Sequence, residues 1–461
     1  MLSSEGNLAN ETVKKWREDK LKKVSHKFLS LSAVALLSLG LLAGCSQGES
    51  AEKAETSKTK EQQEKVSIEY WHANADTQGG KTVTALVDTF NQSQDNIQVT
   101  EKFNPDMYKG LMQNMQAAVA SKTTPDVVQI GWAFLDYFST NFEYSEPQKL
   151  AAEMDPDNAT FLEDNFLPNV LDLAKNNEGK QVGVPYSLST PVLYINQDLL
   201  KEAGLSATGP KTWQEVKSFA KTIKEKTAKY GVYIQEPMDN WATQALLESN
   251  GATFITEGKA TFASPEGIEA YQLWADMVLT DKSAPNIGWD EGVQSFIKGD
   301  VAMLYTTIAQ RNNVQSNINF AATTVSSPAW EGKTPQLPAG GAMLAITATT
   351  DEKKKASWEF MKYLYSIESV SEWTKGTGYV PPRKDVAEAE NGLKAFLAEN
   401  EMMQPAIAQM DKVVSWSSFP GDSGLAAEQK LLDMRDQILT GKVPVAEALE
   451  QTQKEINELL K

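Results

Sequence analysis

The hydrophobic positions between residues 66 and 131 switch repeatedly between an alternating and a helical spacing. Apolar side chains alternate with polar ones from Val66 to Trp71, which predicts a strand. Apolar residues then recur at helical spacing at Val83, Leu86, Val87 and Phe90, and Ile97 and Val99 form a short alternating stretch. Residues 106–121 show a second helical spacing, and residues 127–130 are an apolar run. Strand, helix, strand, helix and strand in this order indicate crossover units in a parallel sheet.

The ends of these strands are the first candidate ligand positions, because ligands of open α/β sheets gather outside the carboxyl ends of parallel strands. The candidates are Trp71, His72, the loop to Gly80, and Gly131-Trp132.

Two helix starts indicate that the α/β pattern continues downstream. Thr212 with Glu215 three residues later forms a capping box. Ser264-Pro265 places proline at a first helical position.

The N-terminal region is typical of an export signal. Residues 28–42 carry no charge and follow a basic stretch, but they are shorter than the roughly 20 residues of a membrane-spanning helix. Leu42-Ala43-Gly44-Cys45 then predicts cleavage before Cys45, the only cysteine, and a diacylglycerol on its sulfur. Cleavage after a small residue without lipid is the alternative. The acidic residues before the basic stretch suggest that the true start codon lies downstream of Met1.

The composition after the signal divides the chain again. Residues 45–65 contain Glu, Lys and no aliphatic side chain larger than alanine, which predicts a lipidated, disordered tether. The remaining residues exceed what one core usually holds and suggest two lobes. Without residues 1–44, which carry seven basic and four acidic residues, the net charge is about −20. This acidity argues against nucleic acid as a partner.

Several motifs in order resemble the family of solute-binding proteins of ABC importers, which includes maltose-binding protein. They are residues 189–205 with 210–213, residues 296–303, Gly340-Gly341 and residues 376–381. The likeness covers residues 66–461 and is closest to the glycerol-3-phosphate-binding subgroup.

This resemblance implies an α/β fold of two lobes, each a mixed but mainly parallel sheet flanked by helices. Three hinge crossings are expected near residues 186–190, 338–343 and 376–381. Residues 1–44 are expected to be the signal peptide and residues 45–65 the tether. The N-lobe is expected to consist of residues 66–187 and 342–378, and the C-lobe of residues 188–341 and 379–461.

The resemblance also implies ligand contacts. Binding positions of the subgroup fall on Tyr108, Ser189, Thr307, Gly341 and Tyr379, although Tyr108 on an amphipathic helix also suits packing. Two departures concern the ligand. The acidic residue expected after the third strand is replaced by Trp132, and no arginine occurs within residues 416–419.

These departures favour a neutral sugar over a phosphate as the ligand, because a dianionic phosphate is normally bound by an arginine or a similar cluster of hydrogen-bond donors. An indole can stack on the apolar face of a sugar ring. Trp241, beside Asn240, is a further candidate on this ground, while Trp289, Trp330 and Trp416 stay unassigned. A large packing residue is the alternative for each tryptophan.

Catalysis is not expected. The chain after Cys45 has one histidine, His72, and no thiol left, so Ser-His and Cys-His systems and His-rich metal sites are excluded. We expect His72 to have a structural role. We also expect the protein to bind no metal ion and no cofactor. A surface glycoside hydrolase, which needs only two carboxylates, is the alternative from another class. A surface adhesin is a third possibility, but this sequence lacks the repeats expected of one.

The expected protein is therefore a monomeric, lipid-anchored binding protein facing the outside of the cell membrane. Its partners are a carbohydrate, or alternatively glycerol 3-phosphate or a glycerophosphodiester, and the transmembrane subunits of an ABC permease.

Overall fold

The computed structural model describes residues 65–176, 178–235, 239–421 and 423–461. The expected signal peptide, Cys45 and all of the expected tether except Lys65 lie outside these residues. Within the described ranges, no helix is both long and apolar enough to cross a membrane.

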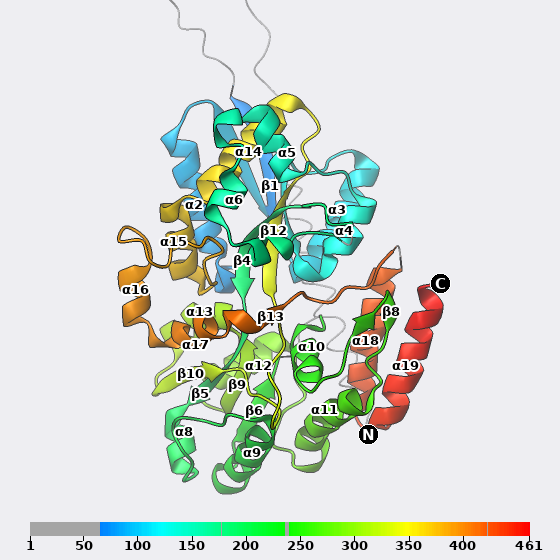
Figure 1. Ribbon diagram of the computed structural model, residues 1–461. Coiled ribbons are helices and arrows are strands. Elements are labelled where there is room, and N and C mark those ends of the chain that lie inside the picture. Colours follow the sequence, from blue (N-terminus) through cyan, green and yellow to red (C-terminus); the bar gives the residue numbers. More distant parts are fainter. Residues whose placement is uncertain (1–64, 177, 236–238, 422) are drawn as a thin grey trace, which may run out of the picture. The chain divides into compact units, whose positions relative to one another are not determined.

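The first lobe, as we name it, is built on a five-stranded sheet in the order β2-β1-β3-β12-β4 (Figure 1). Strand β1 pairs in parallel with β2 and β3, while β12 runs antiparallel to β3 and β4. The strands are β1 (Val66–His72), β2 (Ile97–Phe103), β3 (Val127–Gly131), β4 (Val184–Ser189) and β12 (Gly340–Ile346). The alternating and apolar stretches up to residue 131 thus form the three strands expected from them.

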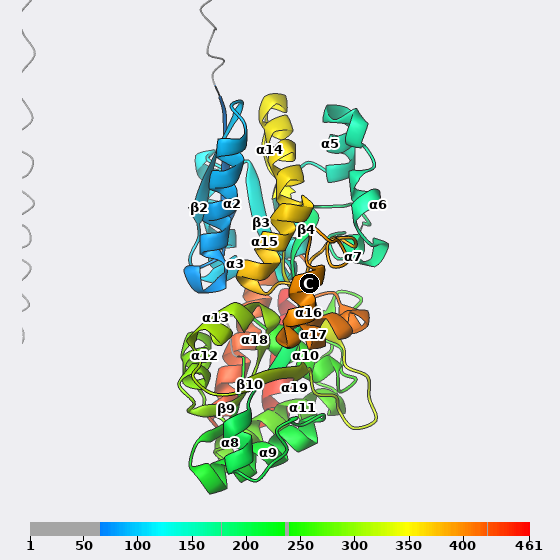
Figure 2. The same ribbon diagram turned by 90° about the vertical axis from the view of Figure 1, so that its left-hand side faces the viewer.

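Helices cover this sheet with the apolar faces that the helical spacing predicts. Val83, Leu86, Val87 and Phe90 are the buried side chains of α2 apart from its first glycine. Helices α2, α14 and α15 contact one another along the sheet (Figure 2). The helices of the first lobe are α2 (Gly80–Ser93), α3 (Met107–Ser121), α4 (Leu135–Asn141), α5 (Pro147–Met154), α6 (Phe161–Asn165), α7 (Pro168–Asp172), α14 (Asp351–Leu364) and α15 (Ile367–Thr377).

The second lobe contains a four-stranded sheet in the order β10-β5-β9-β6. Strand β5 is antiparallel to β10 and β9, and only β6 and β9 pair in parallel. The strands are β5 (Pro191–Asn196), β6 (Tyr230–Ile234), β9 (Val301–Thr307) and β10 (Ala322–Ser326).

Both sheets are mixed and mainly parallel in strand direction, as expected. In the first sheet β12 runs opposite to the other four strands, and in the second sheet β5 runs opposite to the other three. The reason for these reversed strands lies in the passage between the lobes. Strand β4 ends and β12 begins at the same place, where Gly340 pairs with Ser189, so the two run in opposite directions. In the second sheet Pro191 at the start of β5 pairs with Thr307 at the end of β9, with the same result. Strands that begin and end at a shared crossing become antiparallel neighbours.

Two helices of the second lobe, α9 and α11, begin at the predicted signals. Thr212 and Glu215 form the capping box of α9, and the Ser264 side chain accepts a hydrogen bond from the Gly267 N–H at the start of α11. The helices are α8 (Gln197–Glu202), α9 (Trp213–Thr227), α10 (Trp241–Glu248), α11 (Pro265–Ala275), α12 (Trp289–Ile297), α13 (Arg311–Asn317), α16 (Lys394–Glu399), α17 (Gln404–Ala408), α18 (Gly424–Leu439) and α19 (Val445–Leu459). Two short ladders join β7 (Ile255–Thr256) to β8 (Lys259–Ala260) and β11 (Leu337–Pro338) to β13 (Val413–Val414).

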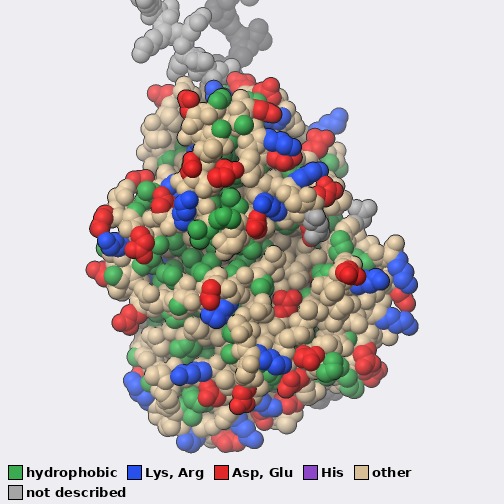
Figure 3. Space-filling model, viewed as in Figure 1, with side chains coloured by type: hydrophobic (Ala, Val, Ile, Leu, Met, Phe, Trp, Pro, Cys, Tyr) green, Lys and Arg blue, Asp and Glu red, His purple; other side chains and the backbone are tan. Residues whose placement is uncertain are grey.

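The core includes the strands that meet at the passage between the sheets. Strands β4, β5 and β12 are buried at every position. On the face shown in Figure 3, hydrophobic side chains gather in a hollow across the middle, and charged side chains are scattered above and below it.

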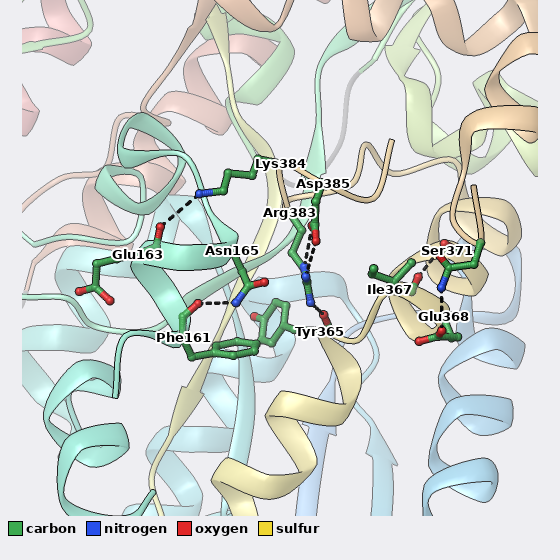
Figure 4. A network of polar contacts seen from close by, with 11 residues as sticks. Phe161, Glu163, Asn165, Tyr365, Ile367, Glu368, Ser371, Arg383, Lys384 and Asp385 are labelled. Carbon is green, nitrogen blue, oxygen red and sulfur yellow. Dashed lines mark hydrogen bonds and ion pairs between the residues drawn. The ribbon is translucent and has the colours of Figure 1, made fainter. Parts of the chain in front are cut away.

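The segment that follows α15 is fixed to the first lobe by polar contacts (Figure 4). Val380 forms a bridge with Leu188 of β4. Arg383 Nη1 donates to the Tyr365 carbonyl at 2.7 Å, and Arg383 also forms an ion pair with Asp385. These contacts position Tyr379 next to the passage between the sheets. The expected lobe boundaries and hinge crossings stay predictions.

Candidate functional site

A pocket of about 40 Å³, which we call the inner pocket, lies where the ends of β4 and β9 meet the starts of β12 and α10. It is lined by Gln78, Met107, Tyr108, Ser189, Gln235, Asp239, Trp241, Trp289, Thr307, Gly340, Gly341, Tyr379 and Trp416. These residues come from segments spread over most of the described chain. The fold therefore brings together side chains that have no local relation in the sequence.

Six of the seven ligand contacts expected from the sequence line this pocket. They are Tyr108, Ser189, Trp241, Thr307, Gly341 and Tyr379. Their role as ligand contacts stays a prediction.

Tyr108 and Tyr379 form a hydrogen-bonded pair on one wall. The two hydroxyls are hydrogen-bonded to each other, and burial raises the pKa of both phenols. The Tyr379 ring stacks on Trp373 at a centroid distance of 5.5 Å, and Trp373 stacks on Tyr186 at 4.9 Å. A stack of three rings therefore holds Tyr379 in place.

Small residues at the ends of three strands also line the pocket. Thr307 Oγ1 accepts a hydrogen bond from the Ala309 N–H at 3.1 Å, which leaves its hydroxyl proton to be donated elsewhere. Gly341 has a φ of 104°, and a Cβ there would lie 2.2 Å from the Ser187 carbonyl oxygen. Glycine at position 341 is thus required by both the backbone conformation and the close approach of β12 to β4.

Three tryptophans supply the aromatic surface of the pocket. The Trp241 indole N–H donates to the Pro338 carbonyl at 2.9 Å, and that of Trp416 donates to Asn240 Oδ1 at 2.7 Å. The Trp289 N–H donates to Thr306 Oγ1 at 3.3 Å. Because their polar groups are bonded within the protein, these side chains offer the pocket their apolar rings.

Asp239 is the one charged residue among the described residues that line the inner pocket. It is half-buried, and its Oδ1 accepts the Trp241 backbone N–H at 3.1 Å. Burial raises the pKa of this carboxyl to about 6. On α18, burial and then the charge of Asp239 raise the pKa of Glu428 to about 8. Arg435 donates to the Asp239 backbone carbonyl at 3.3 Å.

A larger cavity of about 400 Å³, the outer chamber, shares five lining residues with the inner pocket: Met107, Tyr108, Asp239, Trp289 and Trp416. Its further lining includes Asp106, Lys109, Phe134, Gly288, Asp290 and Glu291. Lys109 Nζ donates to Gln429 Oε1 on α18 at 2.6 Å. The two cavities share aromatic walls, and the outer chamber adds acidic groups.

Trp132, the seventh expected contact, lies elsewhere. It follows β3 as predicted, but it is 3% exposed and its indole N–H donates to the Gly340 carbonyl at 3.2 Å. It lines a separate cavity of about 110 Å³, the back cavity, together with Asp136, Lys175 and Ser418 among others. Trp132 and Tyr379 therefore line different cavities. Strand β12 lies directly beside β3, so the start of β12 provides the carbonyl that accepts the Trp132 indole N–H.

Gln78 belongs to the loop to Gly80, which was a candidate ligand position. Sequence reasoning missed six other residues that line the inner pocket: Met107, Gln235, Asp239, Trp289, Gly340 and Trp416. Trp289 and Trp416 carried a signal as tryptophans outside periodic segments. Gln235 follows the end of β6, the kind of position that the rule on strand ends would have selected, and its Oε1 accepts bonds from the Thr306 hydroxyl and the Thr307 N–H.

His72 is buried and lines none of these three cavities. Its Nδ1 accepts the Asn74 N–H at 3.3 Å, and burial lowers its pKa to about 4. The imidazole is therefore neutral around pH 7. Within the described ranges, no group of three His, Cys, Asp or Glu side chains is arranged to hold a metal ion.

Comparison with known proteins gives one coherent result. Residues 85–404 match the model of the family described as bacterial extracellular solute-binding protein. The sn-glycerol-3-phosphate-binding periplasmic protein UgpB of Rhizobium meliloti (strain 1021) is 25% identical over 364 residues, which cover 74% of this chain and 81% of that protein.

Two solved structures share the fold. UgpB from Mycobacterium tuberculosis in complex with glycerophosphocholine matches with a TM-score of 0.75 and 19% identity, over 85% of this chain and 98% of that chain. The cyclic alpha-maltosyl-1,6-maltose binding protein from Arthrobacter globiformis matches with a TM-score of 0.70 and 23% identity, over 86% and 100%. Both are named for binding a solute, and neither is named as an enzyme.

The family match spans more than half of the chain and includes most of the residues around the inner pocket. The chain therefore belongs to the bacterial extracellular solute-binding proteins, and it is a binding protein and not an enzyme.

Proposed function

We propose that this chain is the substrate-binding component of an ABC importer and that it captures a carbohydrate between its two lobes. The composition of the inner pocket carries this proposal. Five aromatic residues line it, Tyr108, Trp241, Trp289, Tyr379 and Trp416, next to hydroxyl and amide groups and without a Lys or Arg among the described lining residues. Aromatic faces with a few convergent polar groups suit a sugar ring, whose faces are apolar and whose rim carries hydroxyls.

Glycerol 3-phosphate or a glycerophosphodiester is the second candidate, because relatives at 25–27% identity are named for glycerol 3-phosphate. A phosphate dianion is normally held by Arg, Lys or several N–H donors. The inner pocket instead presents Asp239, and Lys109 lines the outer chamber but not the inner pocket. On this ground we rank a neutral carbohydrate above a phosphate.

The proposed mechanism is capture without chemistry. A ligand that contacts both lobes stabilises the closed arrangement, so the measured affinity includes the cost of closing. The segments around Thr190, Gly340 and Gly378 are the proposed hinge. The closed, monomeric protein then delivers the ligand to the transmembrane subunits of a permease.

A thermal-shift screen tests the ligand class. Mono- and oligosaccharides and glycerol 3-phosphate are compared at millimolar concentration, with a sugar alcohol at matched concentration as the control for unspecific stabilisation. We expect one saccharide series to raise the melting temperature in proportion to the logarithm of its concentration, because a ligand of the folded state stabilises by mass action. A rise with glycerol 3-phosphate alone would favour the second candidate.

We further propose that Cys45 carries a lipid that holds the protein on the outer face of the cell membrane. The support is the sequence Leu42-Ala43-Gly44-Cys45 after a short apolar run. Replacement Cys45→Ser should release the protein into the medium or leave its precursor uncleaved. Membrane retention of the variant at its mature size would contradict the lipid anchor.

A further inference from the structure

Asp239 occupies a distinctive place in the candidate site, since it is the one described charged residue that lines both the inner pocket and the outer chamber. It lies just before α10, and Asn240 separates it from Trp241. The contact of its Oδ1 with the Trp241 N–H fixes one oxygen at the start of that helix. A ligand that occupies both cavities would lie beside this carboxyl.

The cations near Asp239 lie outside the inner pocket. Arg435 is buried on α18 and donates to the backbone carbonyl of Asp239, and its charge acts to lower the pKa of the Asp239 carboxyl, but it is not among the described residues that line either cavity. Glu428 lies on the same helix, and the charge of Asp239 disfavours its ionisation. Asp290 and Glu291 add exposed acidic groups to the wall of the outer chamber, which also carries the Lys109 ammonium.

We infer that Asp239 is a specificity-determining residue that accepts hydrogen bonds from ligand hydroxyls and keeps phosphate-bearing ligands out of the cleft. An ionised carboxylate has only acceptors, so it pairs with the O–H donors of a carbohydrate. A phosphate monoester near neutral pH carries close to two negative charges and presents acceptor oxygens. Like charges at close range in a cleft of aromatic walls repel more strongly than in water.

This inference rests on the proposed function, but one substitution separates the two. In Asp239→Asn, the side-chain oxygen still accepts the Trp241 N–H, so the start of α10 is preserved while the charge is removed. Glu428 ionises more readily once the charge of Asp239 is gone, and it would restore part of the negative potential. The double variant Asp239→Asn, Glu428→Gln removes both. Asp436→Asn, an exposed position on α18, is the matched control for the loss of one negative charge.

Calorimetric titration with glycerol 3-phosphate at pH 7 is the test, on the full mature chain with folding checked by thermal melting. We expect Asp239→Asn to raise the association constant for glycerol 3-phosphate at least tenfold, the double variant to raise it further, and Asp436→Asn to leave it unchanged. No gain in either Asp239 variant would overturn the inference, whether or not saccharides bind. An equal gain in Asp436→Asn would also overturn it, because the effect would then come from net charge.

The saccharide that performs best in the thermal screen provides the second arm. We expect Asp239→Asn to weaken its binding at least tenfold, and an unchanged affinity would overturn the role of Asp239 as a hydroxyl acceptor. If no saccharide binds and Asp239→Asn still gains glycerol 3-phosphate binding, the carbohydrate proposal fails while the exclusion of phosphate by Asp239 stands.

Discussion

The back cavity beside Trp132 and the inner pocket beside Trp289 are two regions that each contain a tryptophan bonded through its indole N–H. Trp132 is 3% exposed and donates to the Gly340 carbonyl at the start of β12. Trp289 is half-buried at the start of α12, and its N–H donates to Thr306 Oγ1. The first side chain is bonded to the start of β12, whereas the second lines both the inner pocket and the outer chamber.

The two regions also differ in charge. Asp136 and Lys175 line the back cavity, so both signs are present there. Among the described residues that line the inner pocket, Asp239 is the one charged residue. The difference indicates that the position after β3, which the resemblance assigns to the ligand, has become part of the packing beside β12. We therefore expect ligand recognition to depend on the aromatic groups and Asp239 that line the inner pocket.

The largest expected effect is on the stability of Trp132→Ala. Truncation of a buried tryptophan leaves a cavity and should cost about 3 to 5 kcal/mol of unfolding free energy. Urea unfolding without ligand measures it, and Trp132→Phe, which keeps most of the volume, should lose less. A stable Trp132→Ala variant with strongly weakened ligand binding would reverse the comparison and restore Trp132 as a ligand contact.

Trp289→Ala should show the opposite pattern. Its half-buried ring supports little of the core, so we expect a small change in stability without ligand and a loss of about 1 to 4 kcal/mol in saccharide binding, the range of aromatic hot-spot truncations. Titration of the screened saccharide measures this loss. Trp289→Phe keeps an aromatic face and should retain part of the affinity. Full affinity in Trp289→Ala would remove the outer chamber from the ligand site.

Much of the first lobe could be predicted from the sequence because its pattern is local. The strands and helices up to residue 131 follow from hydrophobic spacing, and the capping residues Thr212 and Ser264 mark helix starts. The positions of Tyr108, Ser189, Thr307, Gly341 and Tyr379 came from the resemblance to the glycerol-3-phosphate-binding subgroup, and the structure groups them around one pocket.

The rest depended on pairings that no local pattern contains. The insertion of β12 between β3 and β4 buries Trp132, yet more than two hundred residues separate it from Gly340. The direction of β5 follows from the passage at Thr190 and not from its composition. Asp239 lies in a short segment without periodicity, and its proximity to Tyr108 exists only in the folded chain.

A smaller effect is expected from Glu428, and it concerns how the free energy of unfolding changes with pH. The raised pKa of Glu428, about 8, means that the folded state holds a proton that the unfolded state releases near pH 4 to 5. Stability should therefore fall as pH rises from 6.5 to 8.5. His72, with its lowered pKa of about 4, acts below 6.5 in the opposite sense and does not contribute in this window.

The matched variant is Glu428→Gln, which cannot ionise. We expect its melting temperature to fall less between pH 6.5 and 8.5 than that of the unchanged protein. An identical fall in both would show that Glu428 is already ionised in the folded state and that the cleft carries more negative charge than we infer.

The measurement that tests the central claim most directly is calorimetric titration of one sample of the mature protein with the best saccharide from the screen and with glycerol 3-phosphate. The account predicts that the saccharide binds at least tenfold more tightly, a difference of about 1.4 kcal/mol. Tight binding of glycerol 3-phosphate with no response to any saccharide would contradict it.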